Sequence, residues 1–596
     1  MCGIIGYVGE RQAPDILIDG LQKLEYRGYD SAGIAVFNNN KIEIVKTEGK
    51  VKGLARKKDA AGLTNAVCGI GHTRWATHGE PSDINAHPHR VGRVTLVHNG
   101  IIENYLELSE KFHPTPLSKT DTEIAAAVIN AYYNGNPEQA IFEATALFHG
   151  AYALCIMFED QPNKIYAIRK SSPLIVAVGQ QEVFLASDIP AILSHTKNYY
   201  LPEAGELAVL EKSGVHFVDK DGNTIDKPLK TADWDESAAM KNGYDHYMLK
   251  EIFEQPAVIE QTILRYKNDF TIFENEDFDF EVKGNIHIVA CGSAYHAGLM
   301  GKYAIEKLAR VPVLVHIASE FRYDNPILHK EDLVIAISQS GETADTLAAV
   351  RLAKEHNVRT LAIVNVRGSS LARLSDHTLY TLAGPEIAVA TTKAYLCQVC
   401  LLQLLAVRMA DKGLTMQEYK DMMVAFESLP AQLEEALSFR EQAHQMAKRY
   451  KDVEHVFFMG RGQDSCLAME ASLKLKEISY IHSEAYAAGE LKHGTISLIT
   501  EDTPVISIMT DRARLPKTAS NLKEVKARGA FVTGVTYDDV DTADYTDARI
   551  TIAPVAEITA PMVAIVKLQL LSYYVALENG CDIDQPRNLA KSVTVE

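Results

Sequence analysis

DLVIAISQSGETADTLAAVRLAKEH, residues 332–356, begins with a continuous apolar run, passes through a polar turn and ends with apolar residues at helical spacing. This order predicts a buried strand, a turn and a helix. NIHIVACGSAYHAG (285–298) shows the same order, and RTLAIVNV (359–366) adds another strand. The order returns in EHVFFMGRGQD (454–464) and TPVISIM (503–509). The sequence therefore predicts an α/β unit of roughly 150 residues that occurs twice, each copy with a mostly parallel sheet.

The chain up to about residue 240 follows a different pattern, in which apolar and polar residues alternate. Alternation predicts half-buried strands, and two stretches with helical spacing lie among them. We expect strands at 31–37, 41–47, 67–74, 93–100 and 151–158, and helices at 14–24 and 121–133. Asp121 is the expected N-cap of the second helix. Many strands with few helices predict an α+β sandwich.

Composition limits the possible functions. The 596 residues carry a formal net charge of −18 without a basic block, which argues against nucleic-acid binding as a main function. The apolar segment 561–577 contains Lys567 and Gln569, and the N-terminus lacks the basic region of a signal peptide, so we expect neither a membrane span nor a leader. Eight cysteines without a disulfide framework fit a reducing cytoplasm. Cys397 and Cys400 form a CxxC pair inside an apolar helical run, where packing explains them better than redox chemistry or metal binding.

A polar stretch of mixed charge, without a sustained apolar period, separates the two sequence patterns. Such a stretch is typical of a linker between domains. The predicted organisation is an N-terminal domain at 1–225, a linker at 226–245, α/β domains at 246–425 and 426–582, and a C-terminal tail at 583–596.

Cys2 follows only Met1 in MCGIIGYVG. Removal of Met1 would leave a residue with both a thiol and a free α-amine, whose pKa lies near roughly 7.7–8.0. The thiolate can act as a nucleophile and the amine can take up and return its proton. Alternatively, Cys2 is an incidental small residue after the start. The motifs that follow favour the nucleophile.

Four polar clusters interrupt the predicted strands at their ends. They contain Arg27 and Asp30 in EYRGYDSAG, Arg74, Trp75, Thr77 and His78 in GHTRWATHGEP, Asn99 and Gly100 in HNGIIEN, and Asp121 in SKTDTE. A cysteine acyl-transfer site needs an oxyanion hole, which asparagine side chains and glycine N–H groups supply. An arginine fork can hold a substrate carboxylate, and an aspartate an α-ammonium. Each residue also has a plain structural explanation: Arg27 could pair with Asp30, Asp121 could only cap a helix, and His78 could be a surface residue.

Together with the N-terminal MCGIIGY, these motifs resemble the N-terminal-nucleophile glutamine amidotransferases over the whole first domain. The similarity is closest to the glutaminase domain of the glutamine–fructose-6-phosphate aminotransferase family. It implies a four-layer αββα sandwich in which Cys2 attacks the glutamine side-chain amide, forming a thioester and releasing ammonia. By this resemblance, Asn99 and Gly100 would form the oxyanion hole. Arg74 would bind the glutamine α-carboxylate and Asp121 its α-ammonium. Thr77 and His78 would line the pocket, Arg27 would support the cysteine loop, and Trp75 would be the ammonia gate.

In the first α/β copy, the segment SQSGETADT (338–346) lies between an apolar run and a predicted helix. Its hydroxyls, on Ser338, Ser340 and Thr343, would lie beside unpaired backbone N–H groups at the helix start, which is a common site for phosphate. An ordinary helix cap is the alternative. The segment is not a Walker A loop, and the GRG at 460–462 is too short for a dinucleotide fingerprint.

The two α/β copies resemble the sugar-isomerase (SIS) domains found in the second half of the same family. The resemblance implies that Ser338, Gln339, Ser340 and Thr343 hold a sugar phosphate, and that Ser293, Val389, Thr391 and Lys474 lie around the sugar. Ala294 stands where many relatives have serine, which puts one contact to a sugar hydroxyl in doubt.

Three further residues have implied roles in the sugar chemistry. Glu477 would move a proton between C1 and C2, although a simple ion pair with Lys474 three residues earlier would also explain it. His493 would open the sugar ring across a subunit interface, although it could be a surface histidine. Lys591, in the tail, would form a Schiff base with the open-chain ketose, which needs a lowered lysine pKa.

The resemblance implies conversion of fructose 6-phosphate and glutamine to glucosamine 6-phosphate and glutamate, the first step of the hexosamine and UDP-N-acetylglucosamine pathway. It also implies a cytoplasmic homodimer without nucleic-acid or membrane partners. We expect no metal or organic cofactor, because hydrolysis and 1,2-proton transfer require neither. An amidotransferase with another acceptor is one alternative, disfavoured by the doubled isomerase unit. A non-catalytic sugar-phosphate sensor is another, disfavoured by the joint presence of Cys2, Glu477, His493 and Lys591.

Overall fold

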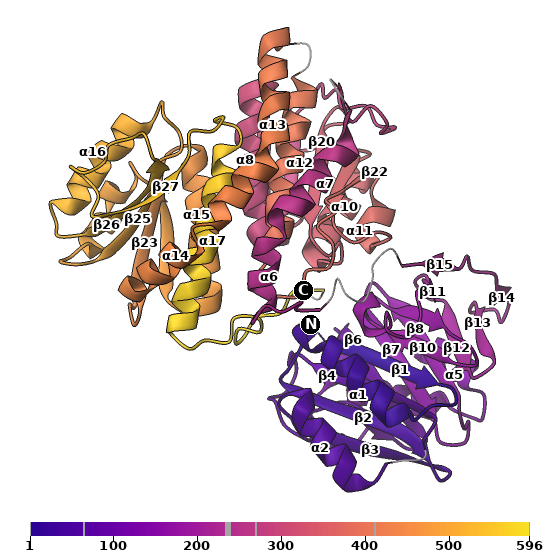
Figure 1. The fold of residues 1–596 in the computed structure, drawn as a ribbon. Coiled ribbons are helices and arrows are strands. Elements are labelled where there is room, and N and C mark those ends of the chain that lie inside the picture. The colour runs from indigo at the N-terminus through magenta and orange to yellow at the C-terminus, as the bar shows by residue number, and fades with distance from the viewer. Residues whose placement is uncertain (1, 64–65, 233–239, 269–270, 411–412, 595–596) are drawn as a thin grey trace. The chain divides into compact units, whose positions relative to one another are not determined.

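The computed structural model describes residues 2–63, 66–232, 240–268, 271–410 and 413–594. The chain divides into two compact units, and each is described by itself (Figure 1). The first unit comprises Met1–Ala239 with Ala590–Glu596, and the second comprises Met240–Leu589. Residues 233–239 of the predicted linker lie outside the described residues. The domain boundaries given above stay predictions.

Two antiparallel sheets form the centre of the first unit. The eight-stranded sheet has the order β15-β11-β9-β10-β1-β4-β2-β3, and the seven-stranded sheet the order β14-β13-β12-β8-β7-β6-β5. The strands of the first sheet are β1 (Gly3–Val8), β2 (Ser31–Asn38), β3 (Lys41–Glu48), β4 (Cys68–Arg74), β9 (Ile175–Val178), β10 (Val183–Ala186), β11 (Asn198–Tyr200) and β15 (Lys230–Thr231). Those of the second are β5 (His89–Val91), β6 (Val94–Ile102), β7 (Gly150–Phe158), β8 (Ile165–Lys170), β12 (Leu207–Glu211), β13 (Gly214–Val218) and β14 (Thr224–Ile225).

Helices cover the outer face of each sheet. α1 (Ala13–Lys23) and α2 (Val51–Ala61) share a core with the eight-stranded sheet. α3 (Tyr105–Phe112), α4 (Asp121–Tyr132) and α5 (Pro137–Thr145) share one with the seven-stranded sheet. A third core, with Ile4, Val97 and Cys155 among its members, lies between the two sheets. The unit is therefore the expected four-layer αββα sandwich.

Every strand and helix that the alternating pattern predicted in the first unit is present, with ends within two residues of the prediction. One detail of the prediction is wrong. The N-cap of α4 is Thr120, whose side-chain oxygen accepts from the Glu123 N–H at 3.3 Å, and Asp121 is the first helical residue. A cap must lie outside the helix with extended backbone, and Thr120 has that backbone. The shift of one residue leaves the Asp121 carboxylate available for other contacts.

The second unit contains two five-stranded parallel sheets with the same topology. Their orders are β19-β18-β20-β21-β22 and β24-β23-β25-β26-β27. The first sheet consists of β18 (Ile286–Ala290), β19 (Val313–Ile317), β20 (Leu333–Ser338), β21 (Arg359–Val364) and β22 (His377–Tyr380). The second consists of β23 (His455–Gly460), β24 (His482–Ala487), β25 (Pro504–Ile508), β26 (Phe531–Tyr537) and β27 (Ala548–Ile552). The predicted repeat with parallel sheets is confirmed.

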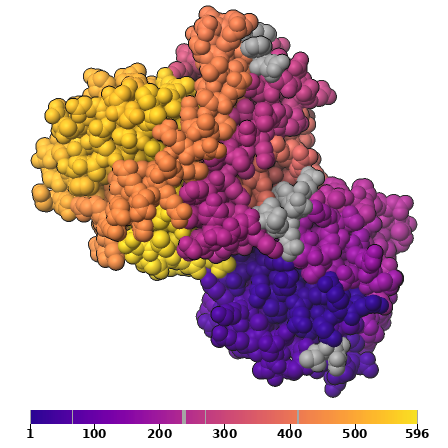
Figure 2. All heavy atoms as spheres, viewed as in Figure 1, coloured from indigo at the N-terminus to yellow at the C-terminus, as the bar shows by residue number. Residues whose placement is uncertain are grey.

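Helices surround both parallel sheets. They are α6 (Tyr247–Phe253), α7 (Gln255–Tyr266), α8 (Gly292–Leu308), α9 (Ala318–Phe321), α10 (Ala344–Glu355), α11 (Ser370–Leu374), α12 (Lys393–Met409), α13 (Met416–Leu437), α14 (Arg440–Ala447), α15 (Gln463–Ser479), α16 (Leu515–Lys526) and α17 (Ala560–Glu578). A short hairpin, β16 (Lys267–Asn268) with β17 (Thr271–Ile272), follows α7. α13 lies at the surface, in orange in Figure 2, where Met416 and Val424 are exposed.

One continuous hydrophobic core joins the two parallel-sheet halves of the second unit. α12 and α17 contribute to this core along most of their lengths, and Cys397 and Cys400 of α12 are fully buried in it, as packing residues should be. By length and composition alone α17 could cross a membrane, with mean hydropathy 1.5, but 94% of that window is buried inside the fold. The two halves therefore share an interior, which holds their loops in fixed relation.

Candidate active sites

Cys2 immediately precedes β1 and lies against the segment that follows the neighbouring strand β4. The backbone N–H of Trp75 donates to the Cys2 Sγ at 3.2 Å, and the thiol faces the Trp75 carbonyl at 3.6 Å. Burial raises the pKa of the Cys2 thiol. The Trp75 N–H and the nearby Arg74 act in the opposite direction, so both would stabilise a thiolate.

Asn99 and Gly100 are consecutive residues of β6, and Asn99 contacts this cysteine. The Asn99 Nδ2 donates to the Cys2 carbonyl oxygen at 2.9 Å. Gly100 has φ +131°, and a Cβ there would lie 1.9 Å from the Ala151 carbonyl oxygen, so only glycine fits. The structure thus brings three predicted residues of the thiol-ester chemistry together, from chain positions almost a hundred residues apart.

Buried His72 fixes the direction in which the Asn99 amide points. Its Nε2 faces two acceptors, the His98 carbonyl oxygen at 2.9 Å and the Asn99 Oδ1 at 3.1 Å, so this nitrogen must carry the proton. Burial lowers the pKa of His72 to about 3, which keeps the ring neutral. The Asn99 Oδ1 is thereby held toward His72 and its Nδ2 toward Cys2.

Arg74 and Asp121 are both buried within the first unit. The Arg74 guanidinium donates to the carbonyl oxygens of His78 and Gly79, while its Nη1 is buried without a hydrogen-bond partner in the described part of the chain. A buried donor without a partner is costly unless a ligand supplies one. Asp121 accepts from the Ile102 N–H at 2.9 Å and lies 3.7 Å from the His98 ring. Both arrangements are compatible with the predicted clamp for an amino acid.

The loop after β4 carries the remaining predicted glutamine residues. Thr77 is exposed and lies 3.4 Å from the half-buried ring of His78, which packs edge-on against Tyr105. The Trp75 ring is partly exposed and packs edge-on against Tyr29. A partly exposed aromatic ring on this loop could move without disturbing the core.

Arg27 lies outside this immediate group. It is buried and pairs with Asp188, with Nη2–Oδ2 at 2.5 Å, and the Tyr26 hydroxyl donates to the same carboxylate. Asp30 instead accepts from the Ala76 N–H at 2.9 Å. Arg27 therefore ties the turn after α1 to the segment after β10, and the Asp30 carboxylate holds the loop after β4.

In the second unit, Ser293 follows the carboxyl end of β18, and Ser338 is the last residue of the adjacent strand β20. This is the point at which the strand order reverses, because β18 has β19 on one side and β20 on the other. Ligands of open parallel sheets bind outside such a switch point. The strand order alone thus selects the location where the sequence predicted a phosphate.

The loop from Ser338 to Thr343 leads directly into α10. The Ser338 Oγ accepts from the Gly341 N–H at 3.0 Å and lies 3.0 Å from the Thr343 Oγ1. The Ser340 Oγ accepts from the Glu342 N–H at 3.2 Å. Thr343 is the N-cap of α10 but makes no side-chain cap bond. Its hydroxyl and the first N–H groups of α10 therefore point toward the same loop, as a phosphate site requires; Gln339 lies within this loop.

A charged cluster on α15 meets Ser293 of α8. The Ser293 Oγ donates to the Glu470 Oε1 at 2.9 Å, and the Lys474 Nζ lies 3.6 Å from Glu470 and 2.5 Å from Glu477. The ion pair between Lys474 and Glu477, which the sequence offered as the simple structural explanation of Glu477, is present. Burial opposes the charge of Lys474, but the two carboxylates outweigh it and raise its pKa, so the lysine stays charged. Residues from both halves therefore form one cluster.

Val389 and Thr391 lie in the segment before α12. The Thr391 Oγ1 donates to the Glu386 Oε2 at 2.5 Å, and Glu386 also adds to the raised pKa of Lys474. The Val389 N–H donates to the Asp584 carbonyl oxygen at 3.1 Å. The segment is thus linked both to the α15 cluster and to the start of the predicted tail.

Two predicted catalytic residues are not joined to this cluster. His493 is exposed in a short 3₁₀ turn, and within the described ranges its imidazole makes no hydrogen bond or ion pair. Lys591 is partly buried in the tail, which groups with the first unit. The roles of both residues stay predictions.

Comparison with known proteins identifies the family. The SIS domain profile matches residues 279–408 and 450–579, and the glutamine amidotransferase domain profile matches 72–194. A Clostridium tetani protein named glutamine–fructose-6-phosphate aminotransferase (isomerizing) is 49% identical over 100% of both chains, and a Thermus thermophilus protein of the same name is 45% identical over 100% of both. The chain belongs to the glutamine–fructose-6-phosphate aminotransferase (isomerizing) family.

Solved structures agree with this family assignment. The C-terminal domain of glucosamine-fructose-6-phosphate aminotransferase from Francisella tularensis is 42% identical, with a TM-score of 0.55, and covers 58% of this chain and 100% of its own. A putative tagatose-6-phosphate ketose/aldose isomerase from Clostridium novyi NT, with a TM-score of 0.50 and 19% identity, covers 58% of this chain and 93% of its own. The latter shows a likeness of fold alone.

Some contacts in this aminotransferase family member were not predicted from its sequence. They are the bond from His72 to Asn99, the pair of Arg27 with Asp188, and the bond from Thr391 to Glu386. Asp188 is 161 residues from Arg27, and no local pattern marks it as a partner. His72 precedes the predicted Arg74 by two positions on β4, so strand periodicity places both on one face; that signal could have drawn attention to it.

Proposed function

We propose that the chain converts fructose 6-phosphate and glutamine to glucosamine 6-phosphate and glutamate, as the names of its full-length relatives indicate for those proteins. The observation that carries the proposal is the presence of two separate constellations in one chain. Cys2 with Asn99 and the unpaired Arg74 Nη1 suits glutamine, and the Ser338 loop with the α15 cluster suits a sugar phosphate.

In the glutamine half-reaction, removal of Met1 frees the Cys2 α-amine to act as the base. The Cys2 sulfur forms a bond to the amide carbon as its proton passes to the amine. Asn99 and Gly100 stabilise the oxyanion, and the proton then leaves with ammonia as the C–N bond breaks. Water hydrolyses the remaining thioester to glutamate. Arg74 and Asp121 bind the α-carboxylate and α-ammonium, Thr77 and His78 line the site, and Arg27 supports its loop.

In the sugar half-reaction, Ser338, Gln339, Ser340 and Thr343 bind the phosphate, and Ser293, Val389, Thr391 and Lys474 surround the sugar. His493 from a partner subunit opens the ring, which implies a homodimer. Lys591 forms an imine with the C2 ketone, releasing water, and ammonia then displaces the lysine. Glu477 removes a proton from C1 and returns one to C2, which converts the ketose imine to the aldose amine.

Ammonia would pass internally from one half-reaction to the other, with the Trp75 ring as its gate. Enclosure has a chemical reason, because ammonia released into water at neutral pH becomes ammonium, which is not a nucleophile. We further propose that the enzyme is cytoplasmic and acts without nucleic-acid or membrane partners, which is compatible with its acidic composition.

The assay that tests this function supplies glutamine and fructose 6-phosphate and measures glucosamine 6-phosphate. Wild type should form it together with equimolar glutamate, and absence of the amino sugar would refute the proposal. Cys2→Ala should lose glutamine-dependent synthesis but make product from added ammonium. Loss of fructose 6-phosphate binding in Cys2→Ala would contradict the assignment of two separate sites.

A further inference from the structure

The two halves of the second unit share one topology, and they correspond residue by residue along α8 and α15 and along α10 and α16. The two SIS ranges, 279–408 and 450–579, have equal length, and α8 and α15 begin and end at the same positions within them. By this correspondence Tyr303 of α8 stands where α15 has Lys474, and Glu306 stands where α15 has Glu477. The helix that mirrors the proposed sugar-binding helix therefore carries its own polar residues at the same places.

The second parallel sheet has a switch point of its own, between β23 and β25. There Asp464 corresponds to Ser293, and Asp511 and Arg514 correspond to Ser340 and Thr343 of the phosphate loop. The buried Asp464 carboxylate accepts from the N–H groups of Thr510 and Asp511, at 2.9 and 3.0 Å. These are the backbone groups that a phosphate would use, so an internal carboxylate closes this switch point to anions.

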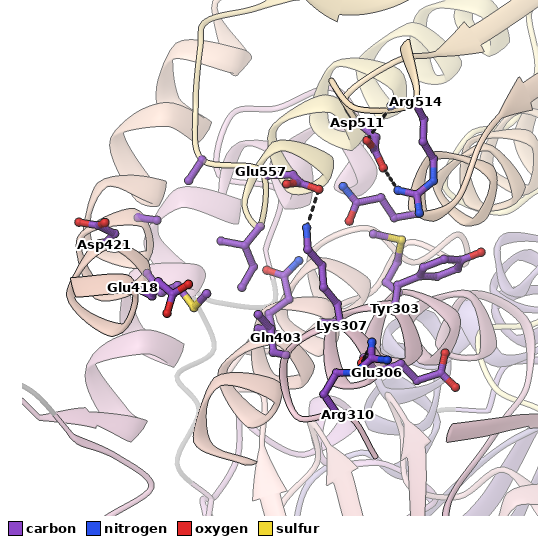
Figure 3. Close-up of a pocket in the computed structure, with 18 residues that line it drawn as sticks. Tyr303, Glu306, Lys307, Arg310, Gln403, Glu418, Asp421, Asp511, Arg514 and Glu557 are labelled. Atoms are coloured by element: carbon purple, nitrogen blue, oxygen red, sulfur yellow. Dashed lines mark hydrogen bonds and ion pairs between the residues drawn. The ribbon is translucent and has the colours of Figure 1, made fainter. Parts of the chain in front are cut away.

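A cavity of about 550 Å³ opens beside this closed switch point (Figure 3). Gln463, Asp511 and Arg514 line it from the second half, and Tyr303 and Glu306 of α8 line it from the first. Its volume lies within the range of small-molecule sites, roughly 300–1,000 Å³. The cavity thus takes the place that the sugar-phosphate site takes in the other half, with different chemistry.

The charges around this cavity favour a cation. Five carboxylate and three cationic side chains line it. Lys307 pairs with Glu557 at 2.7 Å and Arg514 pairs with Asp511, as the dashed lines in Figure 3 show. Glu418 and Asp421, one turn apart on α13, form no ion pair within the described residues. Their hydrogen-bond partners are uncharged: Glu418 accepts from the Thr415 N–H and hydroxyl in the capping box of α13, and Asp421 accepts from the Gln417 amide.

A buried acceptor points to the same class of ligand. Gln403 of α12 is only 2% exposed, and its Oε1 has no hydrogen-bond partner in the described part of the chain. Gln403 and Lys307 both belong to the cavity lining, as Figure 3 shows. An unpaired buried acceptor is unfavourable unless a donor reaches it. Apolar side chains such as Met300, Leu308 and Met422 complete the lining.

We propose that this cavity is a second ligand site, which binds a small protonated organic amine on an apolar body. The ammonium would be held by Glu418 and Asp421 at the rim, its body would lie against the apolar wall, and a donor would reach Gln403. The site is independent of the proposed synthesis, since none of these residues belongs to either catalytic constellation.

The test uses the full-length protein and phenethylamine as the probe, with binding measured by isothermal titration calorimetry. Two matched probes, 2-phenylethanol and phenyl phosphate, separate the ammonium from the ring and from an anion. The amine should bind saturably at one site and at least about tenfold more tightly than either of the others. No saturable binding of the amine, or tighter binding of phenyl phosphate, would overturn the proposal.

Variants locate the probe in the cavity. Glu418→Gln with Asp421→Asn keeps the side-chain volumes and removes both charges, and it should weaken amine binding about tenfold or more. Glu434→Gln makes the same kind of change at an exposed position of α13 outside the cavity and should have no effect. Gln403→Leu should fold with unchanged or higher melting temperature and also weaken binding. If the double variant, Glu434→Gln and wild type all bind phenethylamine with equal affinity, the amine does not bind in this cavity.

Discussion

In the proposed glutamine site, a single hydrogen bond determines whether the Asn99 amide can serve as the proposed oxyanion donor. An asparagine amide can be turned about its terminal bond, so its NH₂ group points to the reacting carbonyl only if a neighbour holds its oxygen elsewhere. In this chain the neighbour is His72, whose Nε2 is 3.1 Å from the Asn99 Oδ1. The ring is neutral and buried, and it stacks on His87 with ring centroids 4.1 Å apart. We therefore expect His72 to position the proposed oxyanion donor.

His72→Leu should lower kcat for glutamine hydrolysis about ten- to a hundredfold, because the Asn99 amide loses its orientation and one oxyanion donor is worth about a hundredfold or more. His72→Gln can place an N–H where the imidazole Nε2 lies and should recover most of that loss. Steady-state glutamate release, with the melting temperature recorded for each variant, measures the effect. If His72→Leu and His72→Gln have equal activity, the side chain at this position serves packing and does not orient the Asn99 amide.

At the scale of the secondary-structure elements, α15 depends on a buried carboxylate at its start. Asp464 accepts from two N–H groups after β25, which fixes the helix against the sheet. Burial raises the pKa of Asp464 to about 6, whereas an unfolded aspartate titrates near about 3.9. Between these values the folded chain binds more protons than the unfolded chain. The contribution of Asp464 to stability is therefore fully present below about pH 4 and is lost as the pH rises through about 6.

Asp464→Asn removes this titration, so the stability of wild type relative to the variant should fall between about pH 4 and 7. The difference between the folded and unfolded pKa of Asp464 corresponds to a fall of at most about 3 kcal/mol in the relative free energy of unfolding. Melting temperatures of both proteins across that pH range measure it. Asp544→Asn, an exposed change of the same kind in the same half, should show no such trend. If the difference in melting temperature between wild type and Asp464→Asn stays constant with pH, Asp464 is ionised in the folded protein over the whole range measured.

The elements themselves could be predicted from the sequence, since apolar periodicity depends on neighbours a few residues away. β2, β4 and β6 agree with the expected strands, and the repeated strand–turn–helix order predicted both parallel sheets. The helix cap at Thr120 was missed by one residue, because Thr120 and Asp121 are both good capping types and only backbone angles distinguish them.

At the scale of the whole molecule, the residues of each site come from distant parts of the chain. Motifs predicted Cys2, Asn99 and Ser338 individually, but the contact between Ser293 and Glu470 depends on how α8 packs against α15 across 177 residues. Such contacts follow from the shared core of the two halves, which no local pattern describes. For the same reason the cavity beside Asp511 could not be predicted: it exists only because the two halves pack together.

The C-terminal tail contributes to both compact units. The buried Asp584 accepts from the N–H groups of Tyr247 and Met248, at 2.9 and 3.0 Å, and so neutralises the start of α6 in the second unit. The residues from Ala590 onward group with the first unit, where Thr594 is only 4% exposed. The proposed Schiff-base residue Lys591 lies between these two anchored points. Its segment therefore has a structural role beside the proposed chemical one, and mutation can separate the two.

Lys591→Arg keeps the charge and the tail but cannot form an imine, so glucosamine 6-phosphate synthesis should fall at least about a hundredfold while the melting temperature stays unchanged. Truncation after Leu589 should abolish synthesis as well, but it should also lower the melting temperature, because it removes the buried Thr594. Borohydride reduction with fructose 6-phosphate should add one sugar phosphate to wild type, at Lys591, and none to Lys591→Arg. Mass spectrometry of the digested protein locates the adduct. Substantial synthesis by Lys591→Arg, or an adduct on another lysine, would show that the tail serves stability alone and that the imine forms elsewhere.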